Sequence, residues 1–142
     1  MTAKEYLEQI GRLDALITQK TAMYRQLKAN YADISGFSFD KDKVKTSKKA
    51  EAPFVSIVER CIELESDITK MENEKNEIIK KIQAITVLKY EVFLYKKFVE
   101  RKSSKVIARE MDYRYEWIKS IQSAAIEHFE KVYAGELAAK TY

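Results

Sequence analysis

The sequence predicts an all-α protein in which a long antiparallel coiled-coil hairpin is followed by a three-helix helix-turn-helix domain. Charged residues make up 34% and hydrophobic residues 46% of the 142 residues, with three glycines and one proline. This composition is typical of long helices with solvated charged faces. Apolar residues recur at heptad spacing through residues 1–86, and two short helical segments flank a tight turn within residues 87–142. These two ranges are the expected domains, the second with a C-terminal helix extension.

The first long helix is expected to begin at Ala3 and to end at Ser35-Gly36. Thr2 followed three residues later by Glu5 is a capping-box pattern. Gly36 favours a stop because glycine readily adopts the left-handed conformation that ends many helices. The heptad positions carry an apolar stripe that Lys20 interrupts once: Tyr6, Ile10, Leu13, Ile17, Tyr24, Leu27, Tyr31 and Ile34.

A basic loop at residues 36–52 is expected to connect this helix to a second one. The segment has no helical period and carries five lysines, so it is typical of a solvated loop, with phosphate contact by these lysines as the lesser alternative. Pro53 fits the first turn of the next helix, where the backbone nitrogens need no helical partner. The second stripe, which Lys75 interrupts, consists of Phe54, Ile57, Cys61, Leu64, Ile68, Met71, Ile78, Ile82 and Ile85.

Two long helices joined by a short connection fold back on each other as an antiparallel pair. Cys61 lies on the apolar stripe, which predicts a buried thiol. Each helix offers only one stripe, so the hairpin packs either on the C-terminal part or on a second copy of the chain. Of these alternatives we favour a homodimer.

A helix over residues 87–99 is expected after the hairpin, with Thr86 as its candidate N-cap. The polar break ERKSS ends it. Its apolar residues predict a broad buried face: Leu88, Val92, Phe93, Tyr95, Phe98 and Val99.

Residues 103–129 have the spacing of two helices around a tight turn. Ser103 or Ser104 is a natural N-cap for a helix over 105–111. Asp112-Tyr113-Arg114 forms the turn, and a longer helix runs from Tyr115 past Phe129. The inner faces are expected to contain Val106, Ile107, Ala108 and Met111 in the shorter helix, and Ile118, Ile121, Ala125, Phe129 and Val132 in the longer one. This is the minimal arrangement of a helix-turn-helix domain.

The run FLYKKFVERKSSKVIAREMDYRYEWIKSIQSAAIEHFE resembles region 4 of bacterial sigma factors. It looks still more like the RinA/ArpU-like late-transcription regulators of phages of Gram-positive hosts, and TAKEYLEQI and APFVSIVERCIELE look like their long-hairpin relatives. The residues in register with the family pattern are Ile107-Ala108, Met111, Tyr113, Ile118-Lys119, Ala125-Ile126 and Phe129. The resemblance implies a phage or prophage transcription regulator that binds double-stranded DNA in the cytoplasm of the host bacterial cell.

The family's recognition helix reads base edges and phosphates in the major groove. Carried onto this chain, the resemblance assigns that role to Arg114, Tyr115, Glu116, Trp117, Lys119, Ser120 and Ser123. Family members usually place several basic residues on this face, whereas aromatic residues and serines occupy much of it here. Cations on the flank either compensate as phosphate contacts or form a solvated charged face: Lys96, Lys97, Arg101, Lys102, Lys105 and Arg109.

The aromatic character of this face supports an alternative from another class. Trp117 beside Tyr115 is also typical of a protein-contact patch, because aromatic residues are enriched at interface hot spots. Under this alternative the chain is a phage protein-binding module that acts on host RNA polymerase or inhibits a host defence enzyme, in the manner of an anti-CRISPR protein. A third alternative is a structural coiled-coil assembly factor.

The residue inventory argues against an enzyme. His128 is the one histidine, glycines stand only at positions 11, 36 and 135, and a single cysteine excludes a disulfide framework and a cysteine-cluster zinc site. We therefore expect no catalytic residues, cofactor or metal. No apolar run approaches the length of a membrane span, and the first residues lack the apolar core of a signal peptide, so a soluble cytoplasmic protein is expected.

Overall fold

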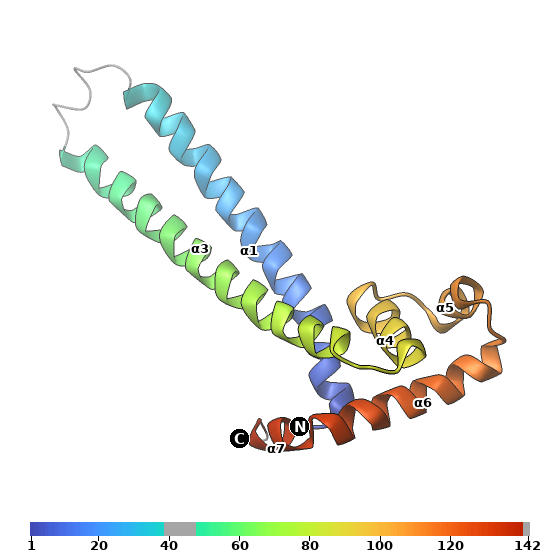
Figure 1. Cartoon of the computed structure of the whole chain (residues 1–142). Coiled ribbons are helices and arrows are strands. Elements are labelled where there is room, and N and C mark those ends of the chain that lie inside the picture. The colour runs from blue at the N-terminus through green and yellow to red at the C-terminus, as the bar shows by residue number, and fades with distance from the viewer. Residues whose placement is uncertain (39–47, 141–142) are drawn as a thin grey trace. The chain divides into compact units, whose positions relative to one another are not determined.

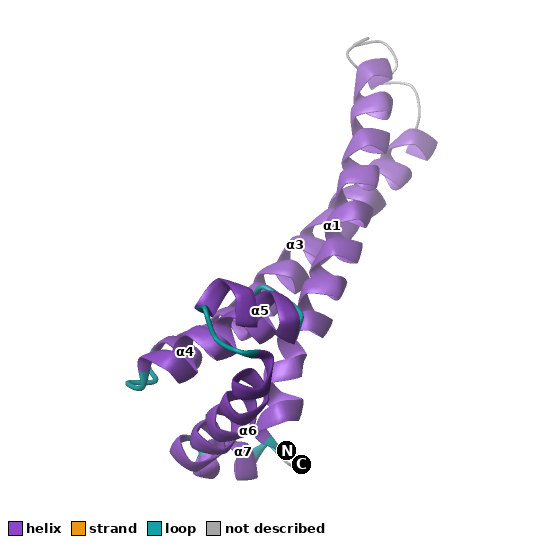
Figure 2. Cartoon of the chain, turned by 90° about the vertical axis from the view of Figure 1, so that its right-hand side faces the viewer, coloured by secondary structure: helices purple, strands orange, loops and turns teal. Residues whose placement is uncertain are grey.

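The computed structural model of the chain describes residues 1–38 and 48–140, and the side chains of residues 1–32 and 55–140. Within these residues every regular element is a helix and there is no strand, which confirms the predicted all-α class (Figure 2). The chain divides into two compact units. One, the two-helix unit, consists of residues 15–72. The other, the multi-helix unit, combines residues 1–14 with residues 73–142.

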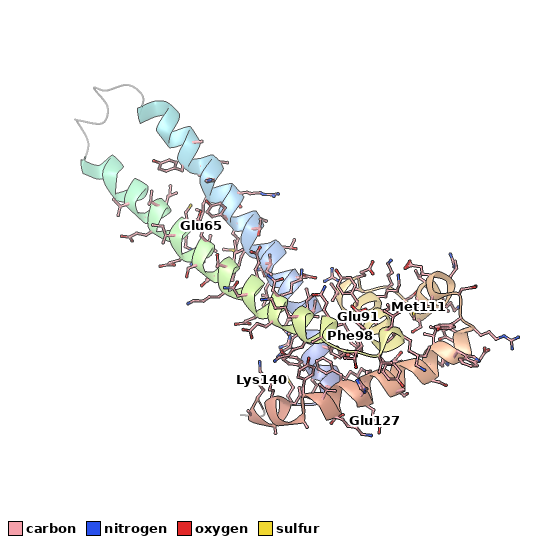
Figure 3. The ribbon with its side chains drawn as sticks, viewed as in Figure 1. Glu65, Glu91, Phe98, Met111, Glu127 and Lys140 are labelled. Atoms are coloured by element: carbon pink, nitrogen blue, oxygen red, sulfur yellow. The ribbon has the colours of Figure 1, made fainter. Side chains whose placement is uncertain are left out.

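The two-helix unit consists of the central parts of α1 (Ala3–Ser38) and α3 (Lys48–Gln83). The two helices run antiparallel: Lys20 forms an ion pair of 2.9 Å with Asp67, and four residues further along α1 the Tyr24 hydroxyl donates to Glu65, which precedes Asp67 in α3 (Figures 1 and 3). Leu64 is fully buried between them. Cys61, expected to be buried, is half-buried.

The ends of the two long helices differ from the sequence-based boundaries. Helix α1 continues to Ser38, and α3 begins at Lys48, so residues 36–38 and 48–52 of the expected loop are helical. Gly36 does not end α1, because a single glycine costs only about 1 kcal/mol in a helix interior. The rest of the expected loop lies outside the described residues, as do the side chains of its lysines.

The multi-helix unit contains the first turns of α1, the last turns of α3, and all the elements that follow. These are α4 (Leu88–Leu94), the π-helix η1 (Tyr95–Val99), α5 (Ser104–Met111), α6 (Tyr115–Val132) and α7 (Ala134–Ala139). Helices α4 and α5 both pack on α6 (Figure 1). The large side chains that are fully buried here are Tyr6, Leu7, Ile10, Ile82, Phe93, Leu94, Ile107, Ile118 and Phe129. Each stabilises the fold by about 1.5–3 kcal/mol through removal of apolar surface from water.

A cluster around Tyr6 joins the two ends of the chain. The Tyr6 ring lies 6.0 Å from that of Phe129, and its hydroxyl accepts a hydrogen bond of 2.9 Å from the Lys81 ammonium. The Tyr133 hydroxyl donates to the Lys81 carbonyl at 2.8 Å. The Lys140 ammonium lies 5.0 Å from the centre of the Tyr6 ring (Figure 3). These contacts hold α7 and the end of α6 against the first turns of α1, all within the multi-helix unit.

Three expectations for this unit are wrong. Val87, not Thr86, is the N-cap of α4 and makes no side-chain cap; the β-branched residue keeps an extended backbone there. Leu88, the first residue of α4, is 73% exposed and is not part of the buried face. Val132 is 52% exposed, since α6 ends there and Leu137 of α7 is buried in its place. The π-helix η1 was not expected.

Candidate nucleic-acid interface

Helices α5 and α6 meet at the turn that the sequence predicted. Ser103 caps α5 by accepting a hydrogen bond of 3.3 Å from the Val106 nitrogen, as one of the two expected serines. Asp112 ends α5 in the left-handed conformation, with φ of 58°, and the Tyr113 nitrogen donates to the Ala108 carbonyl at 2.9 Å. This is the hydrogen bond of a Schellman-type helix end. Arg114 then has an extended backbone and starts α6.

Helix α6 buries one face and exposes the other. Ile118, Ile121, Ala125 and Phe129 are buried. All seven residues assigned to the recognition face are exposed: Arg114, Tyr115, Glu116, Trp117, Lys119, Ser120 and Ser123.

These seven residues do not form one uniform surface. At about 100° per residue, Tyr115 and Lys119 lie along one flank of the exposed face, whereas Trp117 lies along the opposite flank. Glu116 and Ser120 lie between them. The flank with Lys119 is therefore basic and the flank with Trp117 is aromatic.

The flank with Lys119 borders a surface hollow of about 410 Å³, which we call the basic hollow. Two lysines and three hydroxyl groups surround it, from η1, from the first turn of α5 and from α6. Its lining residues are Lys97, Ser104, Tyr115, Lys119, Gln122 and Ser123. The Lys119 ammonium lies 5.0 Å from the centre of the Tyr115 ring, which extends this side chain along the helix. Ser104 and Gln122 were not among the expected site residues.

The six expected phosphate-contact residues fall into two groups. Three of them are held by carboxylates. Lys96 lies 2.7 Å from Glu110, and Lys102 lies 2.7 Å from the same carboxylate and 2.9 Å from that of Glu100. The hydrogen bonds from Lys102 and Lys96 lower the pKa of Glu110, and those to Glu110 and Glu100 raise the pKa of Lys102.

Arg101 is the third paired cation. Its guanidinium lies 2.6 Å from the Asp14 carboxylate in the first turns of α1. The arginine has a left-handed backbone with φ of 54°, and its side chain passes over Gly11: a Cβ at that position would lie 3.5 Å from the Arg101 Cδ. The ion pair between Arg101 and Asp14 therefore connects α1 to the segment before α5.

The other three cations make no ion pair within the described part of the chain. They are Lys97, Lys105 and Arg109, and Arg114 and Lys119 of the recognition face are likewise without a carboxylate partner there. Neighbouring residues of a helix point in directions about 100° apart, which explains why two adjacent lysines differ. Lys96 and Lys97 both lie in η1, yet the first contacts Glu110 and the second lines the basic hollow.

The aromatic flank of α6 belongs to a second surface. The exposed rings of Tyr113 and Trp117 stack with centroids 6.5 Å apart. Beside Tyr113 is a depression of about 250 Å³, which we call the apolar groove. It lies between the first turn of α4 and the end of α5, where Figure 3 labels Met111. Its lining residues are Leu88, Lys89, Val92, Lys96, Glu110, Met111 and Tyr113.

The described residues contain no group of three histidine, cysteine or acidic side chains able to hold a metal ion. The His128 ring is half-buried, 5.4 Å from the ring of Tyr90. None of the helices in this part of the chain has the length and apolar character needed to cross a membrane.

Comparison of the chain with protein-family models, curated proteins and solved structures gives no match. The resemblance to phage regulators therefore stays a prediction.

Proposed function

We propose that this chain is a phage or prophage transcription regulator that binds double-stranded DNA through α5 and α6. In this proposal the two helices form a sigma-region-4-like helix-turn-helix, and α6 enters the major groove. The pair α1 and α3 serves as a coiled-coil arm that joins two copies of the chain. The observation that carries the proposal is the basic hollow, in which Lys97 and Lys119, without an ion pair in the described residues, border the exposed face of α6.

The chemistry of the basic hollow suits a backbone phosphate. Two ammonium groups and the hydroxyls of Ser104 and Ser123 supply hydrogen-bond donors from three elements. Ser104 is the first residue of α5, where free backbone N–H groups and the helix dipole favour an anion. A phosphate held here would fix the orientation of α6 on the duplex without reading sequence.

Base reading in the proposal falls to the exposed residues at the start of α6. Arg114 suits the two acceptors of guanine, and the Glu116 carboxylate suits the amino group of cytosine. The Ser120 hydroxyl makes a weak contact of 3.5 Å with its own helix backbone, so it remains available as a donor or acceptor. These few polar groups would give modest sequence discrimination.

Charge reversal at the basic hollow tests the proposal. The K97E/K119E variant should bind a labelled duplex at least about tenfold more weakly than the wild type at low salt, because attraction to phosphate becomes repulsion. Fluorescence anisotropy measures the affinity. K131E is the matched control: Lys131 is on the same helix as Lys119, is 74% exposed and, among the described residues, pairs with Glu127. Equal affinities of K97E/K119E and K131E would contradict the proposal.

A second candidate function is a protein-binding module that acts on host RNA polymerase or inhibits a host defence enzyme. It is favoured by the pairing of Lys96, Arg101 and Lys102 with carboxylates, which removes half of the expected flanking cations from phosphate binding. Purified host RNA polymerase tests one form of it. Retention by the wild-type chain but not by Y115A/W117A, without any DNA binding, would favour this candidate over the regulator.

A further inference from the structure

The apolar groove opens to the surface although Leu88, Val92, Met111 and Tyr113 among its lining residues are large and apolar. Leu88 is 73% exposed, and Met111 and Tyr113 line the opposite side. Trp117, stacked on Tyr113, is 62% exposed and extends the apolar surface onto α6. Large apolar side chains gathered around a depression, rather than scattered singly, mark an interaction site.

The charges at the apolar groove distinguish it from the basic hollow. Two of its three charged lining residues, Lys96 and Glu110, are paired with each other at 2.7 Å. The pair neutralises that wall, so the groove offers little attraction to a polyanion. Lys89 is the remaining charge, and its ammonium lies 5.4 Å from the centre of the neighbouring Tyr90 ring without an ion pair in the described residues.

The apolar groove is also separate from the DNA-facing side of α6. Trp117 and Lys119 differ by about 160° around the helix axis, since two residues at about 100° each place them on opposite flanks. The basic hollow and the apolar groove share no lining residue, so a phosphate bound in the hollow would not fill the groove. The groove can therefore bind a different partner.

We propose that the apolar groove is the docking site for an acidic amphipathic segment of a protein partner. An apolar side chain of that segment enters between Leu88 and Met111, and a neighbouring carboxylate pairs with Lys89. Trp117 and Tyr113 cover the anchor from the α6 side, as aromatic residues do at interface hot spots. The inference goes beyond DNA binding and does not depend on it.

Selection from a random peptide library against the full-length chain tests this proposal. Enriched peptides should combine a leucine-like anchor with an adjacent Asp or Glu. Trp117 is the only tryptophan of the chain, so its fluorescence emission reports directly on occupancy of the surface. We expect binding of a synthetic enriched peptide to shift that emission to the blue.

Two variants locate the binding. L88E should weaken binding of the enriched peptide by at least about tenfold. K89A should weaken it less, because the apolar anchor provides more of the binding energy than the exposed ion pair. V132E is the matched control, since Val132 is 52% exposed at the far end of α6. Each substituted residue is at the surface, and an unchanged circular dichroism spectrum checks the fold.

Three outcomes would overturn the proposal. The first is that enriched peptides bind L88E and V132E with equal affinity. The second is that they lack acidic residues or are predominantly basic. The third is that L88E converts a wild-type dimer to a monomer, which would assign the groove to a second copy of the chain. DNA binding by L88E at wild-type affinity, measured in the same experiment, separates this test from that of the regulator.

Discussion

At the scale of single residues, a lysine without a carboxylate partner is free to contact a ligand, whereas a paired lysine must first give up its ion pair. Lys96 and Lys97 are neighbours in the chain, yet only Lys97 is without a carboxylate partner in the described structure. The sequence identifies both as cations but does not contain the partner, because Glu110 is fourteen residues away and reaches Lys96 only through packing of α5 on η1. Arg101 is likewise paired, and the sequence does not identify its partner, because Asp14 lies in α1, far away along the chain.

The Glu110 carboxylate predicts a pH dependence of stability. Hydrogen bonds from Lys102 and Lys96 lower its pKa below the ordinary 4.5. A carboxyl group with a lowered folded-state pKa adds stability above its unfolded-state pKa, and this stability is lost as the pH falls through the folded-state value. E110Q should therefore unfold at a lower temperature than the wild type at neutral pH, and the difference should vanish in strong acid.

Thermal unfolding followed by circular dichroism checks this, with E130Q as the control. Glu130 is exposed on α6 and makes no ion pair within the described residues. A melting-temperature difference for E110Q that persists unchanged into strong acid, or that E130Q reproduces, would show that the ion pairs of Glu110 with Lys96 and Lys102 do not act as described.

At the scale of elements, local signals were the reliable part of the sequence. The Ser103 cap and the turn after Met111 depend on residues within a few positions of one another, and both are present. The π-helix over Tyr95–Val99 has no comparable local signature, so it could not be predicted. The helix ends expected at Gly36 and Pro53 were wrong, because α1 continues to Ser38 and α3 already begins at Lys48.

The left-handed Asp112 predicts opposite effects for two substitutions. Glycine adopts φ of 58° without the steric cost of a Cβ, whereas a β-branched residue pays the full cost. D112G should raise the free energy of unfolding by roughly 0.5–1 kcal/mol, and D112V should lower it by about 1–2 kcal/mol. Urea denaturation measures both.

A glycine elsewhere on the surface should have the reverse effect. E130G, in the last turn of α6, should lower the free energy of unfolding by up to about 1 kcal/mol, because glycine is a poor helix former. If D112G were as destabilising as E130G, the turn between α5 and α6 would not have the left-handed geometry that orients the exposed face of α6.

At the scale of the whole molecule, periodicity predicted the helical class and the core positions of α6, but not what covers each apolar residue. Leu88 and Val132 fit their apolar stripes and are nevertheless exposed. Hydrophobic spacing states which residues can be buried, and only the arrangement of neighbouring elements decides whether they are. The boundaries between the two compact units likewise fall within α1 and within α3. The first turns of α1 and the last turns of α3 belong to the same unit as the C-terminal elements.

Net charge is a further property of the whole molecule. The chain carries a formal charge of +4, a small excess for a DNA-binding protein. The cations that can contact phosphate lie close together, between η1 and the middle of α6. Those without a carboxylate partner in the described residues are Lys97, Lys105, Arg109, Arg114 and Lys119. If all five contact phosphates, the logarithm of the binding constant falls against the logarithm of salt concentration with a slope of roughly −4 to −5.

The salt dependence of duplex binding tests the central claim most directly. Fluorescence anisotropy over a range of salt concentrations should give this slope for the wild type, and a slope smaller in magnitude by about 2 for K97A/K119A. An absence of binding at the lowest salt concentration, or a slope that the double substitution leaves unchanged, would contradict the assignment of the basic hollow to DNA phosphate.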